Sequence, residues 1–291
     1  GAIEAEENRD VACCDIPNAF VQTEVQKTDK DGNRTIMKIR GVLVQLMCEL
    51  DESYKDFVVY EGKNDQPVLY VAVGMAIYGM LISALLFYNK LKTDLEGYGF
   101  EVNPYDPCVA NKIVNGSQLT VTWHVDDLKI SHIEAKTVSE FILWVKATYG
   151  AIGEVKTSRG KLHDYLGMKL DYTVPGQLSV NMVEYVEKMV KNFPQDQLTG
   201  AKPKAPWTAN LFTVNEESPK LAKQQAELFH TVVAQGLFLC KRGRPDIAPA
   251  IAFLMTRVKG PDVKDWSKLV KLIQFLKHTS KDVLTIRTDG E

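Results

Sequence analysis

Cysteine pairs with the spacing of a metal site are absent from this chain. Its five cysteines are an odd number and no signal peptide precedes them, so neither a zinc motif nor a secreted disulfide framework is indicated. Reduced thiols inside a cell are the expectation for such a pattern. The five are Cys13, Cys14, Cys48, Cys108 and Cys240.

An excess of positive charge is also absent, because 35 Lys and Arg stand against 37 Asp and Glu. The charge is nevertheless unevenly distributed along the chain. Residues 1–150 carry 14 basic against 22 acidic side chains, whereas residues 151–291 carry 21 basic against 15 acidic ones. The first part can therefore attract a metal ion and the second a nucleic-acid backbone, although charges on exposed helix faces commonly contact only water.

Internal repeats are not evident, and the composition is that of an ordinary soluble globular protein. Disorder is therefore not expected. The length of 291 residues allows a large core and favours two or three subdomains over a single one.

Long uncharged runs are rare, but residues 68–88 hold no charged side chain and by length alone can cross a bilayer. Gly74 interrupts this run. We therefore predict a strand at 68–73 and a buried helix from Met75 to Phe87 that continues to Glu96. The prediction is a protein without a membrane span, and a membrane-anchored protein is the alternative.

Two adjacent carboxylates, Asp126 and Asp127, lie between two runs of alternating apolar residues. The alternation predicts a β-hairpin with the acid pair at its turn. Like charges side by side raise each other's pKa, so the pair costs stability unless a cation neutralises it. A divalent cation with oxygen ligands would do so. The alternative is an ordinary turn, because Asp also favours turns for backbone reasons.

A third carboxylate, Asp15, ends the apolar run that starts at Asp10, and Pro17 and Asn18 follow it as turn residues. Asp15 is therefore predicted at the C-terminal edge of a strand. It can meet the acid pair if the two strands are neighbours in one sheet. Such a cluster is the minimum for two metal ions, one activating an attacking oxygen and one holding the leaving group. In-line phosphoryl transfer uses this arrangement.

Six sequence blocks follow one another along the chain. They are Asp15-Ile-Pro-Asn-Ala-Phe20, Ala76-Ile-Tyr-Gly-Met80, Asn103-Pro-Tyr-Asp-Pro-Cys-Val109, His124-Val-Asp-Asp127, Asp164-Tyr-Leu-Gly-Met168 and Arg244-Pro-Asp-Ile247. In this order they resemble the reverse transcriptases of copia-type (Pseudoviridae-like) LTR retrotransposons, most closely the branch described from diatoms and other marine algae. The first two are similar to motifs A and B of that family, and the fourth takes the place of its Tyr-Val-Asp-Asp turn. The resemblance covers nearly the whole chain.

The resemblance implies a right-hand polymerase of the α+β class, with a palm sheet, a fingers insertion and a helical thumb and connection. Residues 1–172 would form fingers and palm, with the fingers-like insertion near 27–67, and residues 173–291 the thumb and connection. The family's ribonuclease H domain would begin after Gly290, so it is expected to be absent here.

The implied activity is RNA-directed DNA synthesis, in which dNTPs are added to the 3′-hydroxyl of a primer. The implied partners are an RNA template and a DNA or RNA primer, the cofactor is Mg²⁺ or Mn²⁺, and a homodimer is allowed. An intracellular location follows, in the cytoplasm, a virus-like particle or the nucleus. Sequence preference should be weak and salt dependence strong, because such contacts address the backbone and the duplex shape.

Particular residues receive roles from this comparison. Asp15, Asp126 and Asp127 would be the catalytic, metal-binding carboxylates. The nucleotide-binding candidates are Phe20, Lys38, Arg40, Tyr78, Gly79 and Lys156, and the primer-binding candidates are His124, Tyr165, Leu166, Gly167 and Met168. Structural alternatives stay open for four of the nucleotide-binding candidates. Phe20 can be a buried core aromatic, and Lys38, Arg40 and Lys156 can be solvated side chains.

Three departures from the family pattern stand out. His124 replaces a Tyr beside the carboxylates, Met80-Leu-Ile-Ser-Ala84 replaces Leu-Lys-Gln-Ala and offers only Ser83, and the fingers strands that the family places before Asp15 are missing. They keep a second function open, namely a catalytically inert polymerase-like scaffold that binds nucleic acid or its own copies.

The remaining elements are predicted from periodicity and from turn and cap residues. Strands are expected at 35–40, 56–60 and 165–168, and an amphipathic helix at 138–149. The part from residue 173 onward is expected to be an all-α lobe, with helices at 181–193, 218–240, 245–258 and 263–278, the second begun by Ser218 and Pro219.

Overall fold

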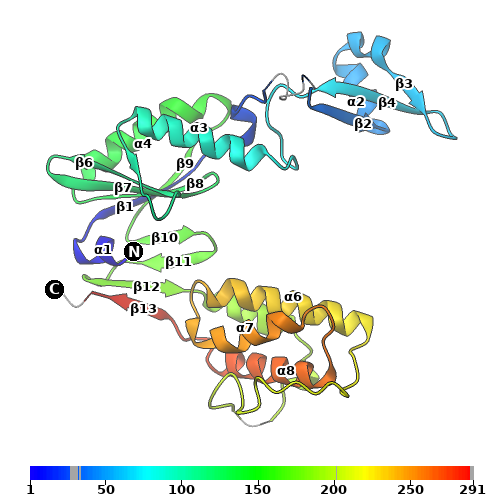
Figure 1. Ribbon diagram of the computed structural model, residues 1–291. Helices are drawn as coiled ribbons and strands as arrows, with labels where there is room; N and C mark the ends of the chain where they lie inside the picture. Colours follow the sequence, from blue (N-terminus) through cyan, green and yellow to red (C-terminus); the bar gives the residue numbers. More distant parts are fainter. Residues whose placement is uncertain (27–31, 33, 201, 289–291) are drawn as a thin grey trace. The chain divides into compact units, whose positions relative to one another are not determined.

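The computed structural model of the chain describes residues 1–26, 32, 34–200 and 202–288 (Figure 1). Runs of strands are separated by helices up to β12 (Gln177–Asn181), a run of helices follows, and the fold is mixed α/β. Two compact units are formed. The first comprises Gly1–Cys13, Ser131–Ala135 and Ser158–Glu291, and the second comprises Cys14–Ile130 and Lys136–Thr157.

A six-stranded sheet has the strand order β5-β6-β7-β8-β1-β9. Its strands are β1 (Asp10–Asp15), β5 (Glu101–Val102), β6 (Val109–Val114), β7 (Ser117–His124), β8 (Asp127–His132) and β9 (Lys156–Gly160). The strands β5, β6 and β7 form an antiparallel meander in which Val121 lies opposite Ala110. The hairpin of β7 and β8 places β8 beside β1, which comes from the start of the chain.

Two helices, α3 (Ser83–Gly97) and α4 (Ala135–Tyr149), lie over one face of this sheet (Figure 1). The helix α3 buries Phe87, Leu91 and Leu95 because residues four apart share one side of a helix. In β7 the alternation of buried residues includes Trp123, which stacks on Tyr88 of α3 with ring centroids 6.3 Å apart. Alternate residues of this strand therefore face away from the helices.

A small lobe within the second unit holds a three-stranded sheet of order β2-β4-β3. Its elements are β2 (Ile36–Arg40), α2 (Val42–Leu50), the 3₁₀ helix η2 (Glu52–Phe57), β3 (Val59–Glu61) and β4 (Gln66–Ala72). Ile39 and Leu69 pack with Val44 of α2 in a small core on one face of this sheet. The predicted strands at 35–40 and 68–73 are confirmed, whereas the one at 56–60 is only partly right because η2 extends to Phe57.

The first unit contains a four-stranded sheet of order β10-β11-β12-β13. Its strands are β10 (Leu162–Tyr165), β11 (Met168–Asp171), β12 (Gln177–Asn181) and β13 (Leu284–Arg287), and the short helix α1 (Ala2–Glu6) precedes them in the chain. Tyr172, Leu178 and Val180 contribute to its core, and the Tyr172 hydroxyl donates to Glu4 at 2.7 Å.

A helical part of the first unit has its own core. It contains α5 (Val183–Lys191), α6 (Lys223–Cys240), α7 (Ala248–Arg257) and α8 (Val263–His278), with the 3₁₀ turns η4 (Gln195–Gln197) and η5 (Pro245–Ile247). Phe229, Leu254 and Leu272 are fully buried in its centre. At Gly236 a side chain would collide with Ile251, so α6 and α7 approach closely there. Elsewhere in the described residues, two further 3₁₀ turns are η1 (Phe20–Gln22) and η3 (Gly150–Ile152).

Three predictions that concern helices need correction. The helix expected from Met75 begins only at Ser83, because Gly79 has φ 94° and the Ser83 hydroxyl donates to the Ile77 carbonyl in an irregular segment. The terminal part is not all-α, since β12 and β13 pair in one sheet.

The third correction concerns the start of α6, which is Lys223 rather than Ser218. The residues before it are extended and pair with the segment before α8: the Leu221 amide donates to Pro261, and Lys220 forms a β-bridge with Asp262. This tertiary pairing prevails over the capping preference of Ser-Pro. By contrast, α8 starts at the predicted Val263 because Asp262 and Asp265 form a capping box.

None of the helices in the described part of the chain combines the length and the apolar composition that a membrane span requires.

Candidate carboxylate site

Asp15 is held at the end of β1 by what surrounds the next residues. Pro17 packs against Gly153, where any Cβ would come within 2.8 Å of the proline ring, and Asn18 turns the chain with φ 50°. Gln22 then donates from its side-chain amide to the Pro17 carbonyl at 2.8 Å and to the Tyr149 carbonyl at 3.1 Å. The turn after Asp15 is thus fixed both by packing and by hydrogen bonds.

The acid pair lies at the tip of the hairpin of β7 and β8. The loop between these strands is only two residues long, Val125 and Asp126, and Asp127 is the first residue of β8. Val125 has φ 59°, whereas Asp126 has a negative φ, as in a type II′ turn. That turn normally has Gly at its first central position. A β-branched residue there is strained by about 1–3 kcal/mol.

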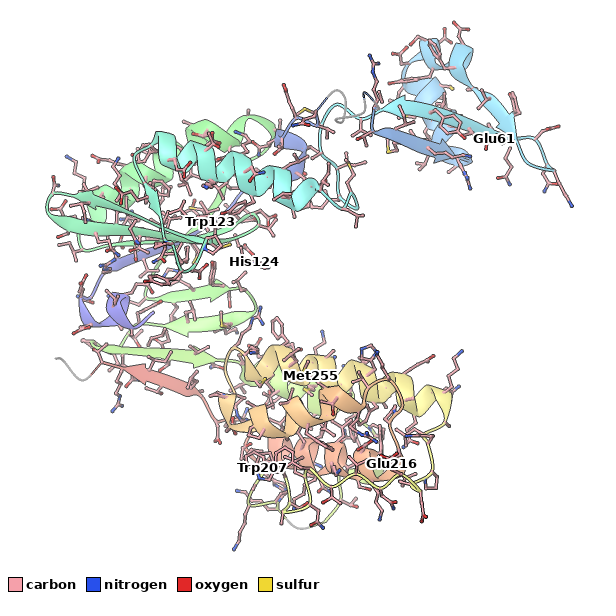
Figure 2. All side chains as sticks on the ribbon, viewed as in Figure 1. Glu61, Trp123, His124, Trp207, Glu216 and Met255 are labelled. Atoms are coloured by element: carbon pink, nitrogen blue, oxygen red, sulfur yellow. The ribbon has the colours of Figure 1, made fainter. Side chains whose placement is uncertain are left out.

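Asp15 and the acid pair come together although they are far apart in the sequence. The strands β1 and β8 are neighbours, and the Ile16 amide donates to the Asp126 carbonyl at 3.0 Å. The residue that follows Asp15 is therefore hydrogen-bonded to the loop residue Asp126 itself. His124 is exposed at the end of β7, next to the buried Trp123 (Figure 2).

Asp127 lies within reach of the charges of Asp126 and Asp15. Burial, followed by the charges of Asp126 and Asp15, raises the pKa of Asp127, and nearby His124 opposes the shift. Burial and then the same two charges, Asp126 and Asp15, raise the pKa of Tyr78. Negative charge therefore accumulates at this point of the second unit.

The carboxylates of Asp15, Asp126 and Asp127 form a set of oxygen ligands that a metal ion could use. Its oxygen atoms are the ligands that Mg²⁺ prefers, and a divalent cation would neutralise the accumulated charge. Within the described part of the chain, however, no group of three or more His, Cys, Asp and Glu side chains is arranged as a metal site. The residues fit such an ion in donor type and in charge, while the side chains as placed are not grouped as ligands.

Aromatic rings from the predicted motifs A and B meet beside the carboxylates. The ring centroids of Phe20 and Tyr78 are 4.7 Å apart, and Phe20 also contacts the buried Phe87 at 6.5 Å. Phe20 is half-buried, while Tyr78 is 58% exposed. Gly79 follows with φ 94° and with open space where a Cβ would be. Phe20 thus has one side toward the core and one toward an exposed tyrosine near Asp15 and Asp126.

Lys156 is the first residue of β9, which is the neighbour of β1. Cys14 and Thr157 share one face of the sheet, since Sγ and Oγ1 are 3.8 Å apart. Side chains alternate along strands, so Lys156 and Asp15 share the opposite face. The lysine is exposed there, on the same side of the sheet as the carboxylate of Asp15.

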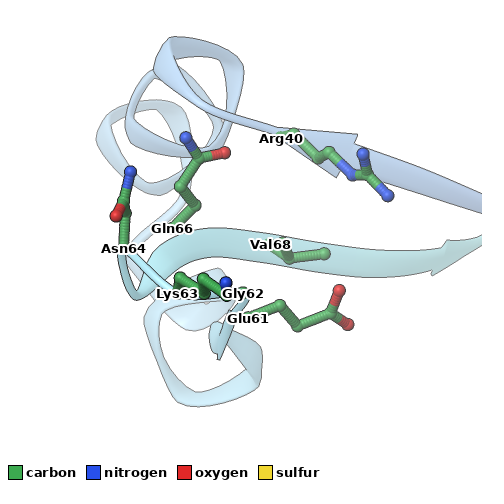
Figure 3. A pocket seen from close by; sticks show the side chains of 7 residues that line it. All are labelled: Arg40, Glu61, Gly62, Lys63, Asn64, Gln66 and Val68. Atoms are coloured by element: carbon green, nitrogen blue, oxygen red, sulfur yellow. The ribbon is translucent and has the colours of Figure 1, made fainter.

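Lys38 and Arg40 share a face of the small lobe. Lys38 forms an ion pair with Glu61 and lies over the Tyr70 ring, 5.1 Å from its centroid, and its hydrogen bonds with these two residues raise its pKa. Arg40 is exposed and borders a pocket of about 230 Å³, in which its side chain and that of Glu61 extend in the same direction (Figure 3). The other lining residues are Gly62, Lys63, Asn64, Gln66 and Val68.

The primer-binding candidates at Tyr165–Met168 form a tight turn instead of the predicted strand. Tyr165 and Met168 lie opposite each other at the ends of β10 and β11. Leu166 and Gly167 have φ of 50° and 76°, the pattern of a type I′ turn, which needs positive φ at both central residues. At Gly167 an added Cβ would come within 3.1 Å of the Phe238 ring. This turn belongs to the first unit and His124 to the second.

Two of the six sequence blocks are explained by local structure. In the block at 103–109, the Asn103 side chain accepts hydrogen bonds from the amides of Tyr105 and Asp106 at 2.8 and 3.3 Å and so forms a turn. In the block at 244–247, Arg244 is buried and binds Asp246 and Thr279. Neither block contains a carboxylate of the site.

Sequence reasoning did not single out Val125 or Gln22. The predicted turn held Asp126 and Asp127, whereas the two loop residues are Val125 and Asp126, one position earlier, and Asp127 already belongs to β8. The role of Gln22 depends on the Tyr149 carbonyl, 127 residues away, and no local pattern reveals it.

Relief of the turn strain is measurable. We expect Val125→Gly to raise the free energy of unfolding by about 1 kcal/mol, because the relieved strain of roughly 1–3 kcal/mol exceeds the entropy cost of an added glycine, about 1 kcal/mol. Urea unfolding of both proteins measures this. Val125→Ala keeps a side chain at positive φ and serves as the control, with a smaller change. A less stable glycine variant would mean that packing of the valine outweighs its backbone strain.

No protein-family model matches the chain. A putative transposon Ty5-1 protein of Saccharomyces cerevisiae is 21% identical over 222 residues, which cover 74% of this chain and 67% of that protein. Two telomerase structures align with 94% of the chain: one from Candida albicans with a fragment of telomeric RNA (TM-score 0.32, 10% identity) and apo telomerase from Candida tropicalis (TM-score 0.35, 11% identity). The chain spans slightly less than half of each telomerase, 46% and 47%.

Proposed function

We propose that this chain is the polymerase part of a copia-type retrotransposon reverse transcriptase, which adds dNTPs to the 3′-hydroxyl of a primer on an RNA template. One observation carries the proposal: the end of β1 and the tip of the β7–β8 hairpin bring Asp15 next to Asp126 and Asp127. The similarity to a protein described as a putative transposon Ty5-1 protein supports a retroelement origin.

The three carboxylates would hold two Mg²⁺ or Mn²⁺ ions. When bound, such ions activate an attacking oxygen and neutralise the charge of the leaving pyrophosphate. The contribution of the chain is to hold the carboxylates adjacent to one another on one sheet. Lys156, on the same face as Asp15, would donate a proton to the pyrophosphate leaving group or neutralise its negative charge.

The incoming nucleotide would lie against the pair of Phe20 and Tyr78. The half-buried ring of Phe20, supported by Phe87, would exclude a ribose 2′-hydroxyl while it also contributes to the core. Arg40 would reach the triphosphate, whereas Lys38 would first have to leave Glu61.

Template and primer would be held mainly through phosphate and shape. The basic excess of residues 151–291, 21 Lys and Arg against 15 Asp and Glu, suits that role. The turn at Tyr165–Met168 and His124 are the proposed contacts to the primer. Such a protein would act inside the cell, in the cytoplasm, a virus-like particle or the nucleus.

A second candidate function is an inert polymerase-like scaffold that binds nucleic acid. The observation that favours it is that the side chains of the three carboxylates are not grouped as metal ligands in the described residues. It shares the nucleic-acid surface of the first proposal and lacks only the chemistry.

Primer extension distinguishes the two. A labelled DNA primer annealed to an RNA template is incubated with the chain, dNTPs and Mg²⁺ or Mn²⁺, and products lengthened one nucleotide at a time are expected. The reaction should stop with EDTA and should discriminate against rNTPs. Retained binding of the primer–template, measured by fluorescence anisotropy, without extension in either metal would overturn the polymerase and favour the scaffold.

A further inference from the structure

The helix α2 of the small lobe exposes an apolar stripe to solvent. The stripe consists of Val42, Leu43, Leu46 and Leu50, which are 65%, 57%, 47% and 85% exposed. At 100° per residue these four positions fall within an arc of about 100°. The opposite side of the helix, with Val44 at its centre, already packs on the lobe's own core.

The stripe is unusual for a short surface helix. Single exposed leucines are common, but contiguous apolar patches of several hundred Å² mark interaction sites. Gln45 and Glu49 are the polar residues of this helix, and both lie to one side of the stripe. No element in the described part of the chain packs over it, because its side chains remain exposed.

We propose that the stripe binds the same stripe of a second copy of this chain, with the two α2 helices antiparallel about a two-fold axis at Leu46. In that register Leu46 meets Leu46, and Leu50 of one copy meets Val42 of the other, so these three apolar residues have apolar partners. A two-fold interface must be self-complementary in this way.

Charge selects the antiparallel arrangement. The first turn of α2 has no acidic residue, and its N-cap, Gly41, makes no side-chain hydrogen bond, so the positive end of the helix dipole is uncompensated. At the other end lie Glu49 and Asp51. In the antiparallel register Asp51 of one copy falls opposite Gly41 of the other. A parallel register would instead bring the acidic ends together.

The size of the stripe sets the strength of the dimer. Four exposed aliphatic side chains offer roughly 400 Å² per copy, so about 800 Å² would be buried in total, which is below the range of stable complexes. A weak, concentration-dependent dimer with a dissociation constant in the micromolar range is therefore expected. This inference does not depend on polymerase activity.

Sedimentation velocity of the full chain between about 1 and 100 μM provides the test. The wild-type chain should shift from monomer to dimer over this range, and Leu46→Glu should raise the dissociation constant at least 100-fold because two like charges meet at the axis. Leu50→Gln, at the most exposed position, should weaken the dimer with little risk to folding. The control is Leu143→Glu, at a leucine of α4 that is 66% exposed, which should leave dimerisation unchanged.

Glu49→Gln tests the electrostatic part separately. It should weaken the dimer about threefold and reduce its salt dependence, while circular dichroism stays that of the wild type. A wild-type chain that remains monomeric at 100 μM, or a Leu46→Glu variant that dimerises as well as the wild type, overturns the proposal. A dimer disrupted equally by Leu143→Glu would place the interface elsewhere.

Discussion

Asp126→Asn should abolish primer extension on an RNA template while the chain stays folded. The substitution keeps the size of the side chain and the backbone carbonyl that accepts the Ile16 amide at 3.0 Å, so the junction of β1 and β8 is preserved. It removes one of the three negative charges that the proposed metal ions require. We expect extension to fall at least about 100-fold, the usual cost of losing an electrostatic contribution to the transition state. Gel analysis of labelled products in Mg²⁺ measures the rate.

Stability provides a second, opposite readout at the same site. Burial, Asp126 and Asp15 raise the pKa of Asp127, so the folded chain binds this proton more tightly than the unfolded chain does. The stability that this group contributes therefore falls as the pH rises from the unfolded-state pKa through the raised folded-state pKa, and it stays low above that window. Asp127→Asn removes the repulsion. The variant should be more stable than the wild type at neutral pH, and the difference should shrink toward acidic pH, as measured by urea unfolding.

Loss of activity together with a gain in stability separates a functional carboxylate from a structural one. The control is Asp196→Asn, an exposed aspartate in η4, which should change neither quantity. If extension by Asp126→Asn equals that of the wild type, the assigned site is wrong. If Asp127→Asn is destabilised at neutral pH, the carboxylate has a structural partner and the proposed charge accumulation is wrong.

The placement of these acids illustrates what a sequence can and cannot predict. The alternation around Asp126 and the turn residues after Asp15 predicted the right strand ends, because strand periodicity and turn chemistry are local. The sequence did not predict that β8 lies beside β1; it indicated only that the acids would meet if the two strands were neighbours. A pairing between residues 111 positions apart is decided by the packing of the whole sheet. Whether the side chains bind metal stays a prediction.

Where the predicted secondary structure was wrong, contacts with other parts of the chain or an irregular backbone determined the conformation. Ser218 and Pro219 favour a helix start, yet the backbone of Pro219 and Leu221 pairs with the segment before α8 and prevents it. The segment at 75–82 is apolar enough for a buried helix, but the positive φ of Gly79 and the bond from Ser83 to Ile77 keep it irregular. The strand β12 was hidden in a predicted helical region because its partner β13 comes from the far end of the chain.

Arg244→Ala should lower the free energy of unfolding by about 3 kcal/mol, because it leaves buried polar groups without their partner. Arg244 is only 3% exposed and lies 5.6 Å from the Phe275 ring. Its Nη1 donates to the Thr279 carbonyl at 2.9 Å and its Nη2 to the Thr279 hydroxyl at 2.8 Å, while Nε and Nη2 together bind both oxygens of Asp246. The arginine thus ties η5 to the end of α8.

The hydrogen bonds to Asp246 and Thr279 depend on the forked shape of the guanidinium. Arg244→Lys keeps the charge but should recover little of the lost free energy of unfolding. Asp246→Asn should cost much less than Arg244→Ala, since Asp246 is half-exposed and water can replace part of the ion pair. Lys241→Ala, at an exposed neighbouring position, is the control and should stay within about 0.5 kcal/mol of the wild type. Urea unfolding gives these values. A loss below about 1 kcal/mol for Arg244→Ala would show that the block at 244–247 is not a structural clamp, and a defect in primer–template binding at unchanged stability would assign this arginine to nucleic acid instead.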